Sequence, residues 1–330
     1  MPDLLTHTLF GEDILKKVND SLSTIIKENR ALFNLGCQGP DIFFYNDYLP
    51  WIKKKRGPKL GALMHNEKTA KFILEAINYL NLNVNNKEDY NKLLSYIIGF
   101  ISHFELDRIA HPYIVYYTGI YDKYDKNTFQ YKGNHKRLEL IIDFLLLKDK
   151  KNKIATKTPL YKIINGGDNL ANIISLFFIS TFNKVYLTNI DKSLINDSYK
   201  DMKKVLKILY DPYGFKKTLL NVVDIATNNK FDYSNLTYPR SIKDNLDYLN
   251  INKNKWNHPC YKNEVYEYSF YELYDIALEI SLSAISKTLK YLNGTIDFLT
   301  FKKSYPNVSY VTGKNTKNKC KMIYTNPIFK

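Results

Sequence analysis

The sequence predicts an all-α protein, and three observations support this class. Apolar residues recur at three- and four-residue spacing along most of the 330 residues, no useful stretch alternates with period two, and no repeat of 20–50 residues is visible. Hydrophobic residues make up 45% and charged residues 25%, ordinary globular values that exclude wholesale disorder. A chain this long can bury enough surface to fold without disulfides or a structural metal.

The first half of the chain is predicted to contain four helices. Apolar spacing indicates a helix from Asp13 to about Leu35, which Gly36 would end, and the Pro/Gly-rich loop CQGPDIFFYNDYLP follows it. Further helices are expected over 66–80, 88–110 and 134–147. Pro112 is expected to end the 88–110 helix, because the residue before a proline is disfavoured in the helical region.

The charged stretch KDKKNK, residues 148–153, is the best candidate for a boundary. Residues 1–150 are therefore predicted to form a metal-binding core. Residues 151–330 are predicted to form a helical C-terminal portion, packed on the core as one domain or as a closely docked subdomain. Helices are expected over 168–182, 191–209, 214–227 and 268–292, and residues 295–330 are expected to be irregular.

The net charge of +15, from 48 basic and 33 acidic residues, suits an anionic partner such as nucleic acid or an acidic membrane surface. A composition biased toward lysine, asparagine, isoleucine and tyrosine is the favoured explanation of this charge. The three cysteines, Cys37, Cys260 and Cys320, are odd in number and widely spaced, and indicate neither a disulfide framework nor a CxxC metal site. With no signal-peptide pattern and no apolar run near 18 residues, a cytoplasmic location is expected.

The segment GFISHFELDRIAHPY carries the strongest functional signal. His103, Asp107 and His111 recur every four residues, so they drift only about 80° around a helix and project from one face. Imidazole and carboxylate are the groups that bind Zn²⁺ in catalytic sites. A carboxylate has two oxygens, so Asp107 could bridge two ions.

The next predicted helix repeats this arrangement, with His135 and Glu139 in GNHKRLE also four residues apart. Either pair alone is more often a surface contact. Two such pairs on neighbouring amphipathic helices predict a metal site between packed helices.

Other polar residues near these motifs have ordinary interpretations when taken singly. His65 precedes a helix and is typical of a capping or surface residue, and Asp41 is typical of a turn. Glu105 faces away from the candidate ligands and is expected to meet solvent or Arg108. His258, in WNHPCYK, is expected in a turn, with contact to a substrate phosphate as the alternative.

Taken together, the MPDLLTH start, the NLGCQGPDIFFY loop, the HFELDRIAHPY helix and the HKRLE pair resemble the zinc-dependent phospholipase C/D family, which is related to the fungal single-strand-specific zinc nucleases. The resemblance covers roughly residues 1–150. The later WNHP and SFYELYDIALE segments are similar to the bacterial branch that lacks signal peptides. The family fold is all-α and multi-helical, with a cluster of three metal ions, usually zinc, between the helices.

The resemblance also implies a set of metal ligands. They are Asp41, His65, His103 and Asp107 for a first zinc, His111, His135 and Glu139 for a second, and Asp107 with His7 for a third. Secreted relatives complete the third site with an N-terminal tryptophan, for which Pro2 or Asp3 would substitute here, so two to three Zn²⁺ ions are expected. Asp41 is also the candidate general base.

The resemblance implies a zinc-dependent phosphoric ester hydrolase of the phospholipase C type, in which metal-activated water attacks a phosphodiester. Glu139 favours the phospholipases, because the nucleases usually carry aspartate there. A nuclease or small phosphodiesterase on the same metal core remains an alternative, as does a non-catalytic, zinc-stabilised binding protein. The expected partner is a phospholipid or other phosphodiester, with transient contact to an anionic membrane surface and no specific nucleic acid. The sequence indicates no oligomeric state.

Overall fold

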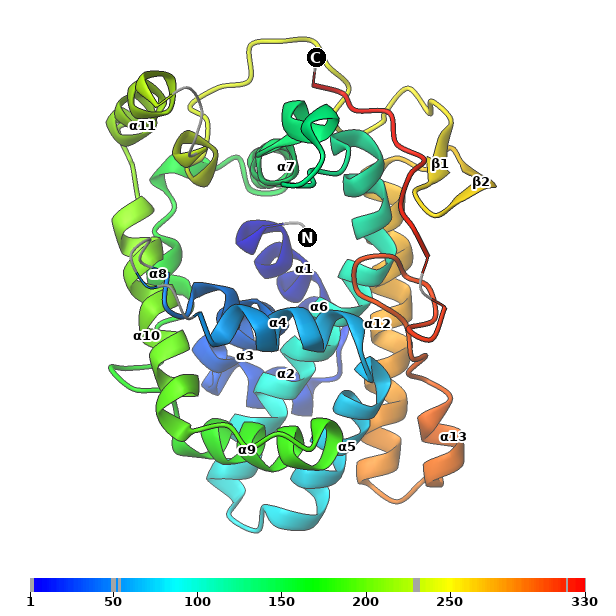
Figure 1. Ribbon diagram of the computed structural model, residues 1–330. Coiled ribbons are helices and arrows are strands. Elements are labelled where there is room, and N and C mark those ends of the chain that lie inside the picture. Colours follow the sequence, from blue (N-terminus) through cyan, green and yellow to red (C-terminus); the bar gives the residue numbers. More distant parts are fainter. Residues whose placement is uncertain (1–2, 49–51, 53–54, 228–231, 319, 330) are drawn as a thin grey trace.

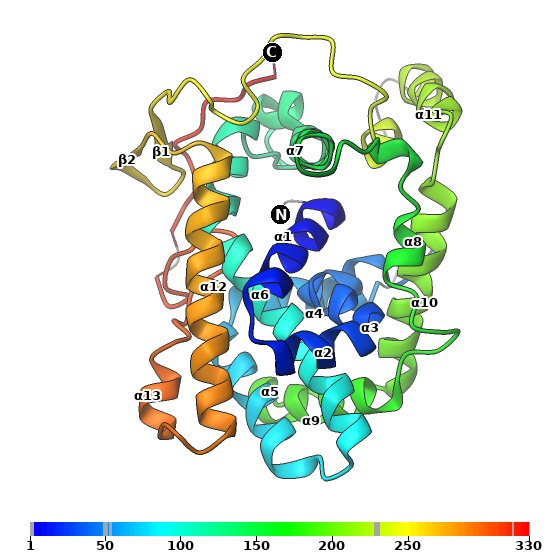
Figure 2. The same ribbon diagram turned by 180° about the vertical axis from the view of Figure 1, so that it is seen from behind.

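The computed structural model describes residues 3–48, 52, 55–227, 232–318 and 320–329, and these are mostly helical (Figures 1 and 2). A single two-stranded sheet accompanies the helices in the described part of the chain. The predicted all-α class is therefore confirmed. Among the described helices, none combines the length and apolar character that a membrane span requires.

The long helix α6, Lys87–Thr118, forms the centre of the molecule and is buried along most of its length. Helix α3, Arg30–Gly36, and helix α12, Phe270–Leu292, pack directly against it. Two glycines allow the close approach of α3. A Cβ at Gly36 would lie 2.1 Å from the carbonyl oxygen of Tyr96, and one at Gly99 would lie 2.3 Å from that of Phe33. The α3–α6 contact therefore depends on the absence of both side chains.

The single helix predicted from Asp13 to Leu35 is wrong, because three shorter helices span this region. They are α1, Leu4–Lys17, α2, Asp20–Glu28, and α3. The side chain of Asn19 accepts a hydrogen bond from the backbone of Leu22 and caps α2, and Asn29 separates α2 from α3. Asparagine favours such breaks because its side chain competes for backbone hydrogen bonds.

The prediction that Pro112 ends its helix is also wrong, because α6 continues for six residues beyond it. Proline removes the N–H that would reach the carbonyl of Arg108. The segment around Gly313 passes so close to that carbonyl that a Cβ at Gly313 would lie 2.4 Å from its oxygen. Burial of the surrounding turns keeps the helix intact, which local propensity could not predict.

The remaining elements surround α6 and carry the rest of the chain. They are η1, Gly39–Tyr45, α4, Gly57–Asn66, α5, Thr69–Asn83, η2, Lys126–Tyr131, α7, Asn134–Lys151, η3, Ala155–Lys157, α8, Leu160–Ile163, α9, Asn172–Tyr186, α10, Lys192–Leu209, α11, Phe215–Ala226, η4, Tyr233–Leu236, and α13, Phe298–Lys302. The charged stretch at 148–153 begins within the last turn of α7. Helix α9 packs on α5 and α10 packs on η1, so the two halves of the chain share contacts. The division at residue 150 stays a prediction.

A β-hairpin and a disulfide were not predicted from the sequence. Strand β1, Trp256–His258, pairs antiparallel with β2, Tyr261–Tyr266, whose exposed residues give little hydrophobic pattern. Cys260 in the turn is joined to Cys320 by a disulfide with a Cα–Cα distance of 5.6 Å. The number and spacing of the cysteines did not indicate this bond, and the third cysteine, Cys37, is free and buried. The expectation of a cytoplasmic location assumed that the cysteines are reduced, and the Cys260–Cys320 disulfide removes that support.

Candidate metal centre

All eight ligands predicted from the sequence lie in three groups that could each hold a metal ion. The groups are His7 with His103 and Asp107, Asp41 with His65 and His103, and His111 with His135 and Glu139. Within each group the candidate ligand atoms lie within 4.8 Å of one another. Helix α6 supplies a residue to every group, and α1, η1, α4 and α7 supply the others. The roles of these residues as zinc ligands stay predictions.

Asp107 occupies the junction between two histidines. One carboxylate oxygen, Oδ2, lies 3.2 Å from Nε2 of His103, and the other, Oδ1, lies 3.2 Å from Nε2 of His7. The rings of His7 and His103 are stacked, with their centroids 4.2 Å apart. Because each oxygen faces a different imidazole, Asp107 has the geometry of a carboxylate that could bridge two cations.

The second group depends on how closely η1 approaches α6. Oδ1 of Asp41 lies 3.2 Å from Nε2 of His65. Gly39, which has a φ of +50°, allows η1 to pass against the His103 ring, since a Cβ there would lie 2.2 Å from a ring carbon. Glycine reaches this conformation without the cost that other residues incur. The sequence QGPD is therefore required both for the turn and for the position of Asp41.

The third group lies where α6 faces α7. Nε2 of His135 lies 2.8 Å from Oε1 of Glu139, and the rings of His111 and His135 lie 4.9 Å apart. Lys136 extends from the same turn, with its Nζ 2.7 Å from Asp3 and 3.7 Å from Glu139. Asp3, one of the two candidates for completing the His7 group, therefore lies beside the group of His111, His135 and Glu139. Pro2, the other candidate for completing the His7 group, lies outside the described residues.

Backbone carbonyls fix the orientation of three of the histidines. Nδ1 of His103 lies 3.1 Å from the backbone carbonyl oxygen of Cys37. Nδ1 of His65 lies 2.7 Å from the carbonyl oxygen of Gly61. Nδ1 of His111 lies 3.1 Å from the carbonyl oxygen of Val311. A carbonyl oxygen can only accept, so each Nδ1 carries the proton. Each Nε2 then keeps its lone pair for the group it faces, as metal-binding histidines require.

Several buried atoms of the first two groups lack a hydrogen-bond partner. They are both ring nitrogens of His7, Nε2 of His103, Oδ1 of Asp41 and both carboxylate oxygens of Asp107. Burying such polar atoms without partners costs free energy. A divalent cation would satisfy them together, and nitrogen and oxygen are donors that zinc accepts. The residues present therefore fit a zinc cluster.

The protonation states also suit ligand binding. Burial opposes ionisation of Asp107, but His103 and His7 outweigh burial and lower the pKa of its carboxyl well below the usual value. Burial lowers the pKa of His111 well below its usual value, so this imidazole is neutral near pH 7. A charged carboxylate and a neutral imidazole are the forms that bind metal.

A carboxylate on α7 positions the helix that carries His7. Asp143 accepts hydrogen bonds from the backbone N–H groups of Leu5 and Thr6, at 2.9 and 2.8 Å, and from the hydroxyl of Tyr238 at 2.7 Å. These N–H groups belong to the first turn of α1, which has no partners within the helix. Asp143 lies four residues after Glu139 and could have been suspected, but nothing in the sequence indicates its partners.

Residues 306–316, here called the closing segment, contact all three groups from the far end of the chain. The Tyr310 ring lies 4.9 Å from that of His65 and 5.8 Å from that of His103, and its backbone N–H donates to the carbonyl of His65. Val311 supplies the carbonyl that orients His111. A backbone carbonyl has no sequence signature, so this role could not be predicted.

Glu105 and His258, which the sequence placed outside the ligand set, both lie near the centre without belonging to any of its groups. Glu105 does not meet solvent; it is fully buried and pairs with Arg108 at 2.5 Å. Burial raises the pKa of Glu105, although Arg108 opposes the shift. His258, expected in a turn, is the last residue of β1, directly before the turn. Its Nε2 donates to the carbonyl of Thr312 at 2.9 Å, and its Nδ1 accepts from the backbone N–H of Cys260. It therefore supports the closing segment and belongs to none of the three groups.

Comparison with protein families gives one match. A family model described as zinc dependent phospholipase C matches residues 6–192, which is more than half of the chain and includes all eight candidate ligands. No curated protein and no solved structure gives a significant match.

Proposed function

The chain belongs to the zinc-dependent phospholipase C family, and from this membership we propose that it hydrolyses a phosphodiester with metal-activated water. Family membership supports a phospholipase C-like hydrolase in general. The observation that carries the finer proposal is the position of Asp107, whose two oxygens face His103 and His7 at equal distances of 3.2 Å.

The proposed reaction assigns separate tasks to the groups. Zinc held by these residues supplies a Lewis acid and a water of lowered pKa. Asp107, whose two oxygens face different imidazoles, would hold two neighbouring cations. Asp41 would take the proton of the attacking water while the water oxygen bonds to phosphorus. The bond from phosphorus to the leaving oxygen would break, and Asp41 would pass the same proton to that oxygen.

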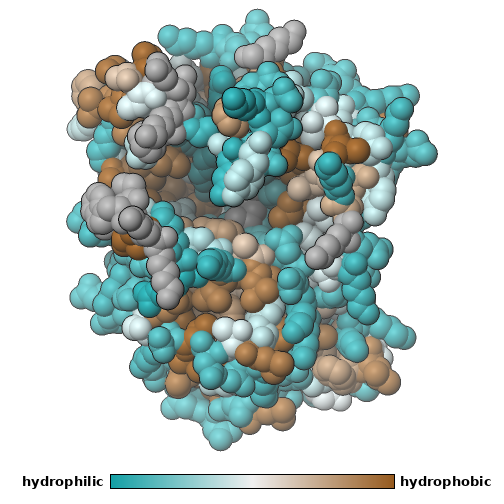
Figure 3. All heavy atoms as spheres, in the orientation of Figure 1, coloured by the Kyte–Doolittle hydropathy of each residue, from teal (hydrophilic) through white to brown (hydrophobic). Residues whose placement is uncertain are grey.

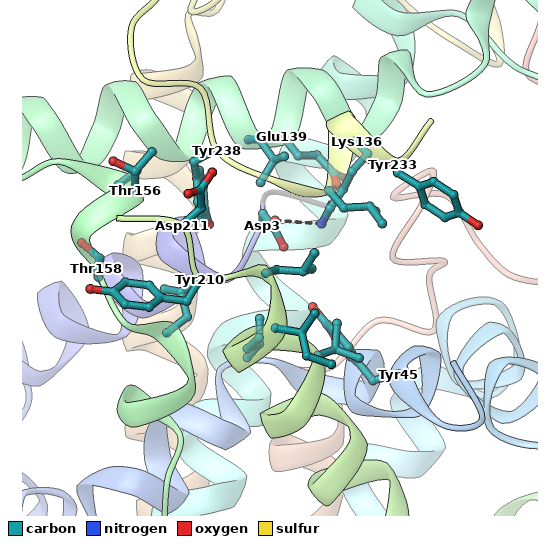
Figure 4. A pocket seen from close by; sticks show the side chains of 18 of the residues that line it. Asp3, Tyr45, Lys136, Glu139, Thr156, Thr158, Tyr210, Asp211, Tyr233 and Tyr238 are labelled. Carbon is teal, nitrogen blue, oxygen red and sulfur yellow. Dashed lines mark ion pairs between the residues drawn. The ribbon is translucent and has the colours of Figure 1, made fainter. Parts of the chain in front are cut away.

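A cavity of about 450 Å³ beside the metal groups supports a lipid substrate (Figure 4). Asp41 and Glu139 line it together with the Asp3–Lys136 ion pair, so one part of its wall is charged. Most of the remaining wall is apolar or aromatic: Phe44, Tyr45, Tyr48, Leu140, Leu160, Val205, Leu206, Ile208, Leu209, Tyr210, Tyr233, Leu236 and Tyr238. A charged region joined to an apolar one matches an amphiphile, with its phosphate near the metal ligands.

The same wall argues against the nuclease alternative. Lys136 is the one basic side chain among the described residues that line the cavity. Proteins that bind a nucleic-acid backbone contact successive phosphates with several lysines and arginines. The cavity does not separate hydrolysis from the non-catalytic alternative, because a zinc-stabilised binding protein would also hold its ligand in a cavity.

The test compares substrates and metal content on one preparation. We expect purified protein to contain zinc, and to hydrolyse phosphatidylcholine, phosphatidylethanolamine or phosphatidylinositol faster than single-stranded DNA. Chelation should abolish this activity and added zinc should restore it. Faster hydrolysis of DNA would favour the nuclease, and bound zinc without hydrolysis of any phosphodiester would favour the binding protein.

A further inference from the structure

Helix α11 exposes an apolar face that the described part of the protein does not cover. Phe215, Leu219, Val222 and Ile225 are 71%, 64%, 57% and 63% exposed. At about 100° per residue these four side chains fall within about 120° of the helix circumference. We call these four residues the α11 face. A large exposed apolar patch marks an interaction site more often than an ordinary surface.

The α11 face lies close to the mouth of the cavity described above. Helix α11 follows α10 after a short turn and packs against η4. Ile208 at the end of α10 and Leu236 in η4 both line the cavity and are 51% and 41% exposed. In the space-filling view, hydrophobic residues gather over the region of α11 and again beside the hollow below it (Figure 3). Apolar surface therefore extends from the helix to the cavity.

Basic residues border this face, whereas its nearest acidic residues are turned inward. The Arg240 guanidinium lies 5.5 Å from the centre of the Phe215 ring. Lys216, the exposed neighbour of Phe215 on α11, donates to the backbone carbonyls of Ile208 and Tyr210 at 2.6 and 2.8 Å. Asp211 and Asp224 are buried and accept backbone hydrogen bonds, Asp211 from Lys217 and Asp224 from Tyr233 and Ser234. The border of the face is therefore cationic, in keeping with the net charge of +15.

We propose that the α11 face docks on an anionic phospholipid surface and inserts its apolar side chains between the lipid headgroups. A helix with an apolar face and basic flanks is typical of segments that lie in the plane of a membrane interface. Each buried apolar side chain favours binding, and the basic border adds electrostatic attraction to anionic lipid. Docking in this orientation brings the mouth of the cavity to the lipid surface.

This inference goes beyond the proposed function, because docking itself requires neither bound metal nor hydrolysis. The probe is a set of sedimentable vesicles, either phosphatidylcholine alone or phosphatidylcholine mixed with phosphatidylglycerol. We expect the full-length protein to co-sediment with the mixed vesicles more strongly than with phosphatidylcholine alone, and added salt should weaken binding.

The variant Leu219→Asp/Val222→Asp should bind the mixed vesicles at least tenfold more weakly, which corresponds to about 1.4 kcal/mol. Its kcat/KM for a water-soluble, monomeric chromogenic phosphodiester should equal that of the parent, because neither residue lines the cavity. Leu82→Asp/Leu187→Asp is the matched control, because it adds the same two charges away from α11 at residues that are 71% and 85% exposed. It should bind as well as the parent.

A second variant keeps the proposal testable if Leu219→Asp/Val222→Asp fails to fold. Val222→Trp places an indole on the α11 face, and its fluorescence should shift to the blue when mixed vesicles are added. The proposal is overturned if the parent fails to bind, if Leu219→Asp/Val222→Asp binds as well as the parent, or if the indole stays in water. It is also overturned if sedimentation velocity shows a dimer of the parent that the same substitutions dissociate, because the face would then bind a second copy.

Discussion

At the scale of single residues, Asp107 has no equivalent elsewhere among the described residues of the centre. It alone faces histidines of two helices, His7 of α1 and His103 of its own helix α6, with different oxygens. Asp107→Asn keeps the shape of the side chain but replaces one oxygen with an amide group that cannot bind a cation. We expect kcat/KM for a phosphodiester to fall roughly a hundredfold or more, on the scale of metal Lewis-acid stabilisation. Steady-state kinetics with zinc analysis of both proteins measures this loss.

A control for Asp107→Asn must make the same chemical change without disturbing the protein core. Glu105→Gln, two residues away, would be expected to be neutral from the sequence, but Glu105 is buried and paired with Arg108, so that substitution would disturb the core. Asp89→Asn makes the same chemical change in the first turn of the same helix, outside the three groups. It should retain the activity and zinc content of the parent. Equal activity of Asp107→Asn and the parent would refute the bridging role.

The residues of the centre were predictable from the sequence to the extent that spacing encodes geometry. His103, Asp107 and His111 share a face because they recur at helical intervals, and the same holds for His135 and Glu139. Asp41, His65 and His7 carry no such spacing and were assigned through family resemblance. Arg108, the partner of Glu105, was expected because it lies three residues along the same helix. The burial of Glu105 and the partners of Asp143 depend on which helices pack together, which local spacing does not encode.

At the scale of elements, Asp13 holds three helices together. This residue of α1 accepts hydrogen bonds from Lys16 at 2.7 Å, from Lys150 of α7 at 2.9 Å and from Tyr274 of α12 at 2.8 Å. Burial opposes ionisation of Asp13, but these donors outweigh it and lower the pKa of the carboxyl below its ordinary value of 3.8. The stability that Asp13 contributes is therefore present above about pH 4 and is lost as the pH falls further.

Asp13→Asn should accordingly lower the free energy of unfolding at pH 7 by about 1 kcal/mol, a value reduced for solvent screening of a partly exposed group. The difference from the parent should shrink as the pH falls from 4 toward 2. Urea denaturation of both proteins at several pH values, with chelator present throughout to remove the separate effect of metal, tests this. A difference that is constant with pH would mean that the charge of Asp13 is irrelevant.

The Cys260–Cys320 disulfide is the second element-scale feature with a measurable effect. It joins the hairpin turn to the chain just beyond the closing segment, whose Val311 carbonyl orients His111. Cross-linking residues 60 positions apart restricts the unfolded chain, and the loop-entropy relation gives roughly 4 kcal/mol. We expect Cys260→Ser to lower the melting temperature and weaken zinc binding.

Reductant provides the control for this variant, since it should destabilise the parent and leave Cys260→Ser/Cys320→Ser unchanged. Thiol titration of unfolded parent purified without reductant should give one free cysteine, Cys37. Three free thiols would show that the bond does not form. Such a result would restore the expectation of a reduced chain, since disulfides persist in oxidising compartments.

Sequence periodicity predicted most helices and missed the features that depend on distant contacts. The helices over 191–209, 214–227 and 268–292 agree closely with α10, α11 and α12. Pro112 stays inside α6 because burial of the adjacent turns outweighs the lost hydrogen bond. The β-hairpin has too few alternating residues to be recognised, and the closing segment acts largely through its backbone.

At the scale of the whole molecule, the three groups draw side chains from five elements of the first 140 residues. Without a cation, the polar atoms of His7, His103, Asp41 and Asp107 that lack a hydrogen-bond partner would remain buried at a cost in free energy. Metal that binds only the folded state stabilises it by about 2.7 kcal/mol at a hundredfold excess over its dissociation constant. Chelation should therefore lower the melting temperature by several degrees, and zinc should reverse the change. Scanning fluorimetry measures it, and an identical curve for metal-free protein would argue against a stabilising cluster.

The late position of the closing segment in the chain has a consequence for biosynthesis. His7 emerges first, whereas Tyr310 and Val311, which cover and orient the candidate ligands, are polymerised about 300 residues later. At about 5–20 residues per second, the ribosome needs roughly 15–60 s to make the intervening chain. During that time the ligand side chains are present on a nascent polypeptide whose centre lacks its final walls. Tight loading of zinc is therefore expected to follow release from the ribosome, so nascent chains arrested before residue 306 should retain the metal less firmly than the finished protein.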